Sequence, residues 1–246
     1  MDTRSHFELV GEFHDVFGHP QKQTPFLDCF EKEYRMVPFR ISLLKEECDE
    51  FKNALYNTAF DDEKKLVEMG DALCDLAYFL FGTGHCLGID IDDLLKGMNL
   101  SLSTPGRLSV SNVVNMNVLK TNHLMIESGL MRMDQYILWF SAAAGSQDFD
   151  GMRKNLGGLA HATYELGHSL NFNMDQMFRE VHRSNMSKVC LTLEDAEVSV
   201  EFYKTEGRYK SPAIRTKGKY FVVYDSATTK ILKNHKWNMP DLKQFF

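Results

Sequence analysis

The stretch MVPFRISLLKEECDEFKNALY, Met36 to Tyr56, decides the fold of this 246-residue chain. Its apolar residues recur three and four positions apart, the spacing that places side chains on one face of an α-helix. Pro38 stands where the first helical turn tolerates proline. The same helix carries four acidic residues within EECDEF, Glu46 to Phe51, where neighbouring like charges repel one another. The sequence therefore predicts a helix whose concentration of negative charge needs a physical reason.

The overall composition is that of a globular protein and not of a nucleic-acid binder. Hydrophobic residues make up 43% and charged residues 25% of the chain, which is enough for a sizeable core. The formal net charge of -6 argues against a nucleic-acid polymer as partner. The five cysteines are scattered without metal-type spacing, which favours buried thiols in a reducing compartment. Because no apolar run resembles a leader or a membrane span, we expect a cytoplasmic protein with no membrane partner.

A second predicted helix also carries a group of acidic residues. It begins after a pair of aspartates that can cap it and runs to the glycines between 82 and 88. Glu68, Asp71 and Asp75 share one of its faces, and the residues between them are small or apolar. Carboxylates in such a setting are unfavourable unless a cation compensates them, and oxygen-only ligands suit Mg²⁺, or Mn²⁺, and not zinc. The alternative is that both acidic faces are simply solvated.

The rest of the chain is predicted to be helical until a small β-hairpin near the C-terminus. Past Lys188 the pattern predicts a helix that ends at Gly207, then two β-rich runs in KYFVVYDSATTKILK, and an aromatic tail that docks on the protein. Between the second helix and Lys188 the expected elements are a short helix over 91–98, a loop over 101–112, and helices near 113–128, 132–144, 150–170 and 174–187.

A shared pattern in the two helical halves indicates an internal duplication. GHCL at 84–87 recurs as GHSL at 167–170, and the same offset of 83 (167 minus 84) pairs Asp92 with Asp175. A chance match between two amphipathic helices is the alternative. We expect an all-α helical bundle from a tandem duplication, with a first repeat over 1–105, a degenerate second repeat over 106–190, and a C-terminal helix, hairpin and docking tail over 191–246.

The ordered acidic motifs resemble a known family. EExxE followed by ExxD, here Glu46-Glu47-x-x-Glu50 and Glu68-x-x-Asp71, is similar to the signature of the all-α nucleoside triphosphate pyrophosphohydrolases. These include MazG proteins, dimeric dUTPases, dCTP pyrophosphatases and phosphoribosyl-ATP pyrophosphohydrolases. The segments FHDVFGHPQKQTPF, VHRSNMSKV and TKILKNHKWNMPDL look like the phosphoribosyl-ATP pyrophosphohydrolase-like branch, so the resemblance covers most of the chain.

The resemblance implies roles for the first-half carboxylates. Glu47, Glu50, Glu68 and Asp71 would bind Mg²⁺, and Glu46 would either help to ligate the ion or polarise the attacking water. Glu46 and Glu47 are therefore the candidate catalytic residues. Family members cleave the α–β phosphoanhydride of a nucleotide to a monophosphate and pyrophosphate.

The second half departs from the family pattern at the metal positions. The offset of 83 carries Glu68 to Gly151 and Asp71 to Lys154, so this half cannot hold the same site. We therefore expect one working site, built by complementary halves of a monomer that imitates a dimer, although a homodimer of the whole chain stays open.

The candidate substrate-binding residues come from both halves. Asn185 and Lys188 offer an amide and a point charge to phosphate or sugar oxygens; the alternative is a helix end with a solvated lysine. Arg40 is a further candidate for phosphate, unless it is only a salt-bridge partner of the acidic face. Asp75, one turn beyond Asp71, is expected to support the metal ligands or the substrate.

The expected function is Mg²⁺-dependent hydrolysis of a (deoxy)nucleoside triphosphate in nucleotide metabolism. Two alternatives stay open: hydrolysis of phosphoribosyl-ATP in histidine synthesis, and a non-catalytic nucleotide-binding regulatory role.

Overall fold

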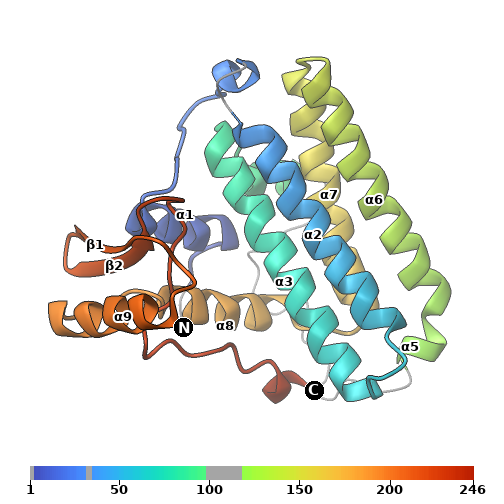
Figure 1. Ribbon diagram of the computed structural model, residues 1–246. Helices are drawn as coiled ribbons and strands as arrows, with labels where there is room; N and C mark the ends of the chain where they lie inside the picture. The colour runs from blue at the N-terminus through green and yellow to red at the C-terminus, as the bar shows by residue number, and fades with distance from the viewer. Residues whose placement is uncertain (1–2, 32–34, 98–117) are drawn as a thin grey trace.

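Four long helices lie side by side and form the body of the protein (Figure 1). They are α2 (Met36–Tyr56), α3 (Asp62–Leu87), α6 (His123–Gly145) and α7 (Phe149–Ser169). In this computed structural model, which describes residues 3–31, 35–97 and 118–246, α2 and α3 form one antiparallel hairpin and α6 and α7 a second. The hairpins pack together through α2 against α6 and α3 against α7. The expected all-α bundle with a small β-hairpin is confirmed.

The two acidic helices begin and end where their local sequence predicts. Helix α2 spans the predicted 36–56. The side chain of Asp61 caps α3 by accepting a hydrogen bond from the Lys64 N–H at 2.8 Å. Gly88 ends α3 in the left-handed conformation, with a φ of 68°, which glycine adopts without steric cost. These caps set the register in which the acidic faces of α2 and α3 meet.

Shorter helices cover the ends and one side of the bundle. Helix α1 (His6–Phe17), which the sequence analysis did not predict, packs against α3 and α8 (Met174–Met186). Helix α8 also packs on α3, whereas α4 (Ile91–Gly97) packs on α7. Two further short elements are the 3-10 turn η1 (Leu27–Phe30) and α5 (Val118–Thr121). Each hairpin is thus covered by the short helix that follows the other hairpin.

The two helical halves use the same close packing at positions 83 residues apart. A Cβ on Gly84 would stand 2.8 Å from Cγ1 of Ile91, and a Cβ on Gly167 would stand 2.6 Å from Cγ of Met174. At both places a glycine near the end of a long helix lets the next helix turn back closely.

One predicted helix break is wrong. Helices were expected over 113–128 and 132–144, but α6 runs unbroken from His123 to Gly145. Gly129 in its middle fits because a Cβ there would stand 3.0 Å from Cδ1 of Leu166, so the glycine allows α7 to approach. The predicted loop at 101–112, the first residues of the 113–128 helix and the 105/106 repeat boundary lie outside the described residues.

The C-terminal part forms a small unit beside α1 and α8 (Figure 1). Helix α9 (Leu193–Glu206) ends at Gly207 as predicted. Strand β1 (Pro212–Lys217) pairs antiparallel with β2 (Tyr220–Asp225), with Lys217 opposite Tyr220. The second β-rich run predicted in KYFVVYDSATTKILK is wrong, because Ile231 makes only an isolated bridge to Tyr224. The partner strand instead precedes the turn at Gly218, whose φ of 57° favours glycine.

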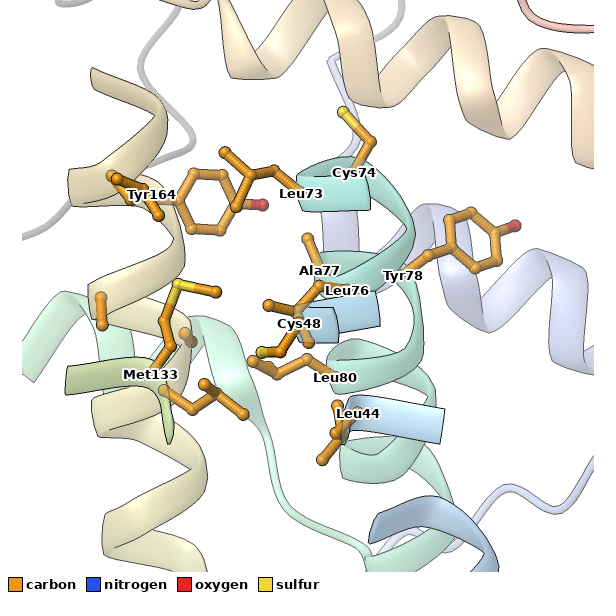
Figure 2. Packing of buried hydrophobic residues seen from close by; sticks show 14 of the residues in the cluster. Leu44, Cys48, Leu73, Cys74, Leu76, Ala77, Tyr78, Leu80, Met133 and Tyr164 are labelled. Atoms are coloured by element: carbon orange, nitrogen blue, oxygen red, sulfur yellow. The ribbon is translucent and has the colours of Figure 1, made fainter. Parts of the chain in front are cut away.

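The core lies between the two hairpins, and α3 separates it from the side of the protein that carries α1 and α8. In Figure 2, Leu73, Leu76 and Leu80 of α3 point toward Met133 and Tyr164, whereas Tyr78 points away from them. The expected docking of the tail is confirmed: Leu242 is buried, and Phe246 beyond η2 (Lys243–Phe245) makes an edge-to-face contact with Phe172 at 5.3 Å.

The cysteines and the apolar helices agree with the sequence analysis. All five cysteines are free and buried. Among the described residues no single helix has the length and composition to cross a membrane. Helices α3 and α4 meet the length and composition criteria only when they are taken together, and the pair is bent by 109°.

Candidate active site

The predicted carboxylates lie on facing stripes of α2 and α3. Glu47 and Glu50 are separated by three residues on α2, and Asp71 and Asp75 by four on α3, so each pair shares a helix face. Because the helices are antiparallel neighbours, their charges act on one another: Glu47 is affected by Asp75, Glu50 and Asp71. The structure thus brings the acidic residues of the two motifs together.

Glu47 is the most buried member of this cluster. Only 6% of it is exposed, and its Oε2 is buried without a hydrogen-bond partner among the described residues. Burial, reinforced by the charges of Asp75, Glu50, Glu46 and Asp71, raises the pKa of Glu47 to about 9. A carboxylate held this way needs a proton or a cation as partner.

The pKa values of Asp71 and Asp75 on α3 are raised as well. Burial and the charges of Glu68 and Glu50 raise the pKa of Asp71 to about 6. Burial and the charge of Asp71 raise the pKa of Asp75 to about 7. Glu46, Glu50 and Glu68 are exposed at the edge of the cluster. The solvated-face alternative is therefore wrong for Glu47, which is buried.

A cavity of about 240 Å³ opens beside these carboxylates. Its walls include four aromatic side chains: Phe13, Phe39, Tyr78 and Phe79. Its polar groups are Arg40, Asp75, Asn185, Lys188, His14 and His19. All four predicted substrate-binding residues therefore line one cavity, although they come from α2, from α3, and from α8 and the residues just after it.

Lys188 sits between the cavity and the carboxylates. Its Nζ donates a hydrogen bond to Oδ1 of Asn185 at 2.6 Å, so the two predicted partners act as a pair. Burial lowers the pKa of Lys188, although the charge of Asp75 opposes that shift. The solvated-lysine alternative is wrong, because Lys188 is half-buried and lines the cavity.

Arg40 lines the cavity from α2. It is buried, with 8% exposed, and its Nη2 donates to Sγ of Cys86 at 2.9 Å. The salt-bridge alternative is wrong for the described part of the chain, where Arg40 forms no ion pair with a carboxylate. Seven residues separate Arg40 from Glu47, which is about 10 Å along a helix axis.

The C-terminal tail brings another cation to the acidic cluster. Nζ of Lys233 lies 3.4 Å from the ring centroid of Trp237, and its charge acts on Asp71 and Asp75. The backbone around it is anchored, since the Tyr203 hydroxyl donates to the Lys233 carbonyl at 2.9 Å. Burial lowers the pKa of Lys233, opposed by those aspartates.

The carboxylate cluster fits a hard divalent cation by its chemistry. All its donors are carboxylate oxygens, and one of them, Oε2 of Glu47, is buried without a partner. In the described residues no three histidine, cysteine or acidic side chains are already gathered closely enough to enclose an ion. Because Mg²⁺ usually keeps several waters and takes few protein ligands, such an open arrangement suits it better than a closed protein cage.

Several residues of this site were missed in the sequence analysis. His14 and His19 lie on and after α1, which was not predicted as a helix. The signal for His14 was its position four residues after Val10 and three before Phe17, on the apolar stripe of that helix. The signal for Tyr78 was its position one turn beyond Asp75 on the same helix. Lys233 gave no such signal, because it comes near the aspartates of the cluster only through the docking of the tail.

The comparisons with known proteins agree with this geometry. Residues 10–101 match the model of the family described as phosphoribosyl-ATP pyrophosphohydrolase, whose members are hydrolases acting on phosphoanhydride bonds. The chain is also 29% identical, over 246 residues, to the uncharacterized protein L479 of Acanthamoeba polyphaga mimivirus, covering 98% of this chain and 95% of that protein. No solved structure gives a significant match.

Proposed function

We propose that this chain acts as a MazG-like all-α NTP pyrophosphohydrolase, the superfamily of the family model that residues 10–101 match, and that it cleaves the α–β phosphoanhydride of a (deoxy)nucleoside triphosphate. The products are a nucleoside monophosphate and pyrophosphate. The observation that carries the proposal is the buried, unpartnered Oε2 of Glu47 within a carboxylate cluster that borders a cavity lined by Lys188 and Arg40.

The proposed cofactor is Mg²⁺, with Mn²⁺ as the alternative ion. Glu47 and Glu50 of α2 and Glu68 and Asp71 of α3 are its proposed ligands. When bound, the ion supplies positive charge that neutralises the triphosphate and stabilises the leaving pyrophosphate.

The side chains around the ion have separate roles in binding the substrate and in activating water. Glu46, exposed at the cluster edge, orients the attacking water and accepts its proton, or else completes the ligand set. Asp75 holds Lys188 toward the phosphates through its charge. Lys188 and Asn185 bind phosphate or sugar oxygens, and Lys233 adds a second ammonium group on the same side.

The proposed architecture is a tandem duplication in which one chain imitates a dimer. The equivalent packing of Gly84 on Ile91 and of Gly167 on Met174 supports it, as does the exchange of α4 and α8 between the hairpins. The proposed repeats are 1–105 and 106–190, followed by 191–246. We propose a cytoplasmic protein, without membrane or nucleic-acid partners, that is a monomer or a homodimer of the whole chain.

Two alternatives have specific support. Phosphoribosyl-ATP hydrolysis is favoured by the description of the matched family. A non-catalytic nucleotide-binding role is favoured by the loss of acids in the second half, where Lys154 stands at the position equivalent to Asp71. Against that role, a buried carboxyl without a hydrogen-bond partner, such as that of Glu47, is costly to keep in a protein that only binds.

The test is to incubate the purified chain with each NTP and dNTP, and with phosphoribosyl-ATP, in the presence of Mg²⁺. Chromatography then identifies the products. The proposal expects a monophosphate and pyrophosphate from a nucleoside triphosphate. Preferential turnover of phosphoribosyl-ATP would favour the first alternative. Nucleotide binding without turnover would favour the second.

A further inference from the structure

The cavity beside the carboxylates has two chemically different ends. Asp75 and Lys188 lie at the end that borders the acidic cluster. Arg40 and Gly82 lie seven residues away from Glu47 and Asp75 on their respective helices, so both are about 10 Å from the cluster along the helix axes. A nucleotide whose phosphates occupy the cluster would extend its base toward the Arg40 end.

Aromatic side chains make the walls of this cavity suited to a flat ring. Phe13 and Tyr78 meet edge to face, with centroids 5.4 Å apart and an interplanar angle of 86°. Phe39 and Phe79 line the same cavity. Since aromatic faces stack on any base, these walls hold a base without selecting among bases, and selection falls to the polar groups.

Arg40 is the hydrogen-bond donor at this end. Arg40 is more than nine-tenths buried, and its guanidinium has a thiol as its hydrogen-bond partner among the described residues. A thiol is a weak acceptor, so this buried cation leaves donor capacity for a stronger one. A carbonyl oxygen of a ligand supplies such an acceptor.

His14 is the hydrogen-bond acceptor beside it. Nδ1 of His14 lies 2.8 Å from the carbonyl oxygen of Pro20. A carbonyl only accepts, so Nδ1 carries the proton and donates. Burial lowers the pKa of His14 to about 3, and the charge of Arg40 adds to the shift, so the ring is neutral. Nε2 therefore presents a lone pair, to which the described residues offer no donor.

The donor and the acceptor converge on one point of α3. A Cβ on Gly82 would stand 3.2 Å from Nη1 of Arg40 and 2.9 Å from Nε2 of His14. The absence of a side chain at Gly82 is what lets both groups approach α3. Because Arg40 and His14 both line the cavity, a ligand in it meets a positive donor and a neutral acceptor side by side.

From this pairing we infer that Arg40 and His14 read the base, and that they select bases carrying a carbonyl next to a ring N–H. The carbonyl accepts from Arg40 while the ring N–H donates to Nε2 of His14. Hypoxanthine, guanine, uracil and thymine carry this edge. The inference rests on the proposed function and adds the base preference to it.

Adenine and cytosine are rejected in the same pose. Their amino group would point its hydrogens at the guanidinium, and their unprotonated ring nitrogen would face the lone pair of His14. Two donors and two acceptors would then be opposed in a buried site, and buried polar groups without partners are strongly unfavourable. Discrimination therefore comes from repulsion as well as from attraction.

Two matched pairs of substrates test the inference: dITP against dATP, and dUTP against dCTP. Each pair differs only in the carbonyl and ring N–H edge. With Mg²⁺ present we expect kcat/KM to be about 10- to 100-fold higher for the carbonyl member, because a hydrogen bond to a charged group is at stake. Equal values, or a preference for dATP and dCTP, would overturn the inference.

Variants assign the selection to the named residues. In Arg40→Met the two ratios should fall toward one, Arg40→Lys should restore them in part, and His14→Phe should also lower them. Arg132→Met is the matched control, since Arg132 lies on α6 and pairs with Glu165 at 2.6 Å, and it should leave both ratios unchanged. Ratios that persist in Arg40→Met and His14→Phe, with circular dichroism showing folded protein, would refute the assignment.

Failure of the proposed function would look different. If no triphosphate is turned over, calorimetric titration of the wild type with dIMP and dAMP still tests base selection. Tighter binding of dIMP, lost in Arg40→Met, would uphold the inference while the proposed activity fails. Equal binding of the two monophosphates, or no binding, would overturn it.

Discussion

Replacing the buried carboxylate Glu47 with glutamine should stabilise the metal-free protein while removing its function. The side chain is 6% exposed, and its Oε2 has no hydrogen-bond partner among the described residues. An unpaired buried charge costs more than an unpaired neutral polar group, here on the order of 1–3 kcal/mol, and the neighbouring carboxylates add repulsion whenever Glu47 is ionised. Glutamine keeps the shape and removes the charge.

The size of this stabilisation depends on pH within a defined window. The ordinary pKa of this carboxyl is 4.5, and burial raises it to about 9 in the folded chain. Between those values the unfolded chain releases the proton and the folded chain keeps it, so the stability of the wild type falls as pH rises. The advantage of Glu47→Gln should therefore grow from pH 5 toward pH 9.

The assay is thermal unfolding in EDTA, followed by circular dichroism. A gain of about 1–3 kcal/mol corresponds to roughly 2–12 °C in Tm for a chain of this size. Added Mg²⁺ should raise the Tm of the wild type, since a ligand that binds only the folded state stabilises it, and should raise that of Glu47→Gln much less. A variant that is less stable in EDTA at pH 8, or that gains as much from Mg²⁺, would refute the reasoning.

Three further predictions concern separate parts of the molecule. Gly88→Ala should destabilise the fold far more than Gly207→Ala. Both glycines have a positive φ, which costs alanine about 1–2 kcal/mol, but only at Gly88 would the Cβ stand 1.9 Å from the Thr24 carbonyl oxygen. Equal losses of stability for the two variants in urea unfolding would contradict this. His14→Gln should reduce the loss of stability on acidification. In the folded wild type the buried His14 takes up its proton only near its pKa of about 3, whereas in the unfolded chain it does so near 6.5, so the wild type loses stability as pH falls between those values. An unchanged slope of Tm against pH in the variant would argue against this. Lys233→Ala should raise the KM for nucleotide about 2- to 5-fold, the scale of an exposed charge interaction, with an unchanged circular dichroism spectrum; an unchanged KM would remove Lys233 from the site.

Local signals in the sequence were sufficient to predict the two acidic helices. Helix α2 has the predicted ends, and α3 is capped by Asp61 and Gly88, both residues with strong positional preferences. Helix α6 was predicted as two helices, over 113–128 and 132–144, and Gly129 lies in its middle. Its fit depends on Leu166 of a neighbouring helix, and such tertiary contacts are not visible in local periodicity.

The candidate site was predictable where its chemistry repeats along one helix. The spacing of Glu47 and Glu50, and of Asp71 and Asp75, already implies shared faces. The cavity was not predictable, because residues of α1 and residues at the end of α8 complete its walls from distant parts of the chain. The role proposed for His14 in particular depends on its contacts with Arg40 and Gly82, which only the folded structure shows.

The most direct test of the central claim is the Mg²⁺-dependent release of pyrophosphate by Asp71→Asn and by Lys154→Asn. These positions are equivalent in the two proposed repeats, and only the first carries an acid. With a single carboxylate site on α2 and α3, Asp71→Asn should lose about 100-fold or more in kcat, whereas Lys154→Asn should keep the wild-type rate. Full activity in a folded Asp71→Asn, or loss of activity in a folded Lys154→Asn, would contradict the assignment of the only active site to the first half of the chain.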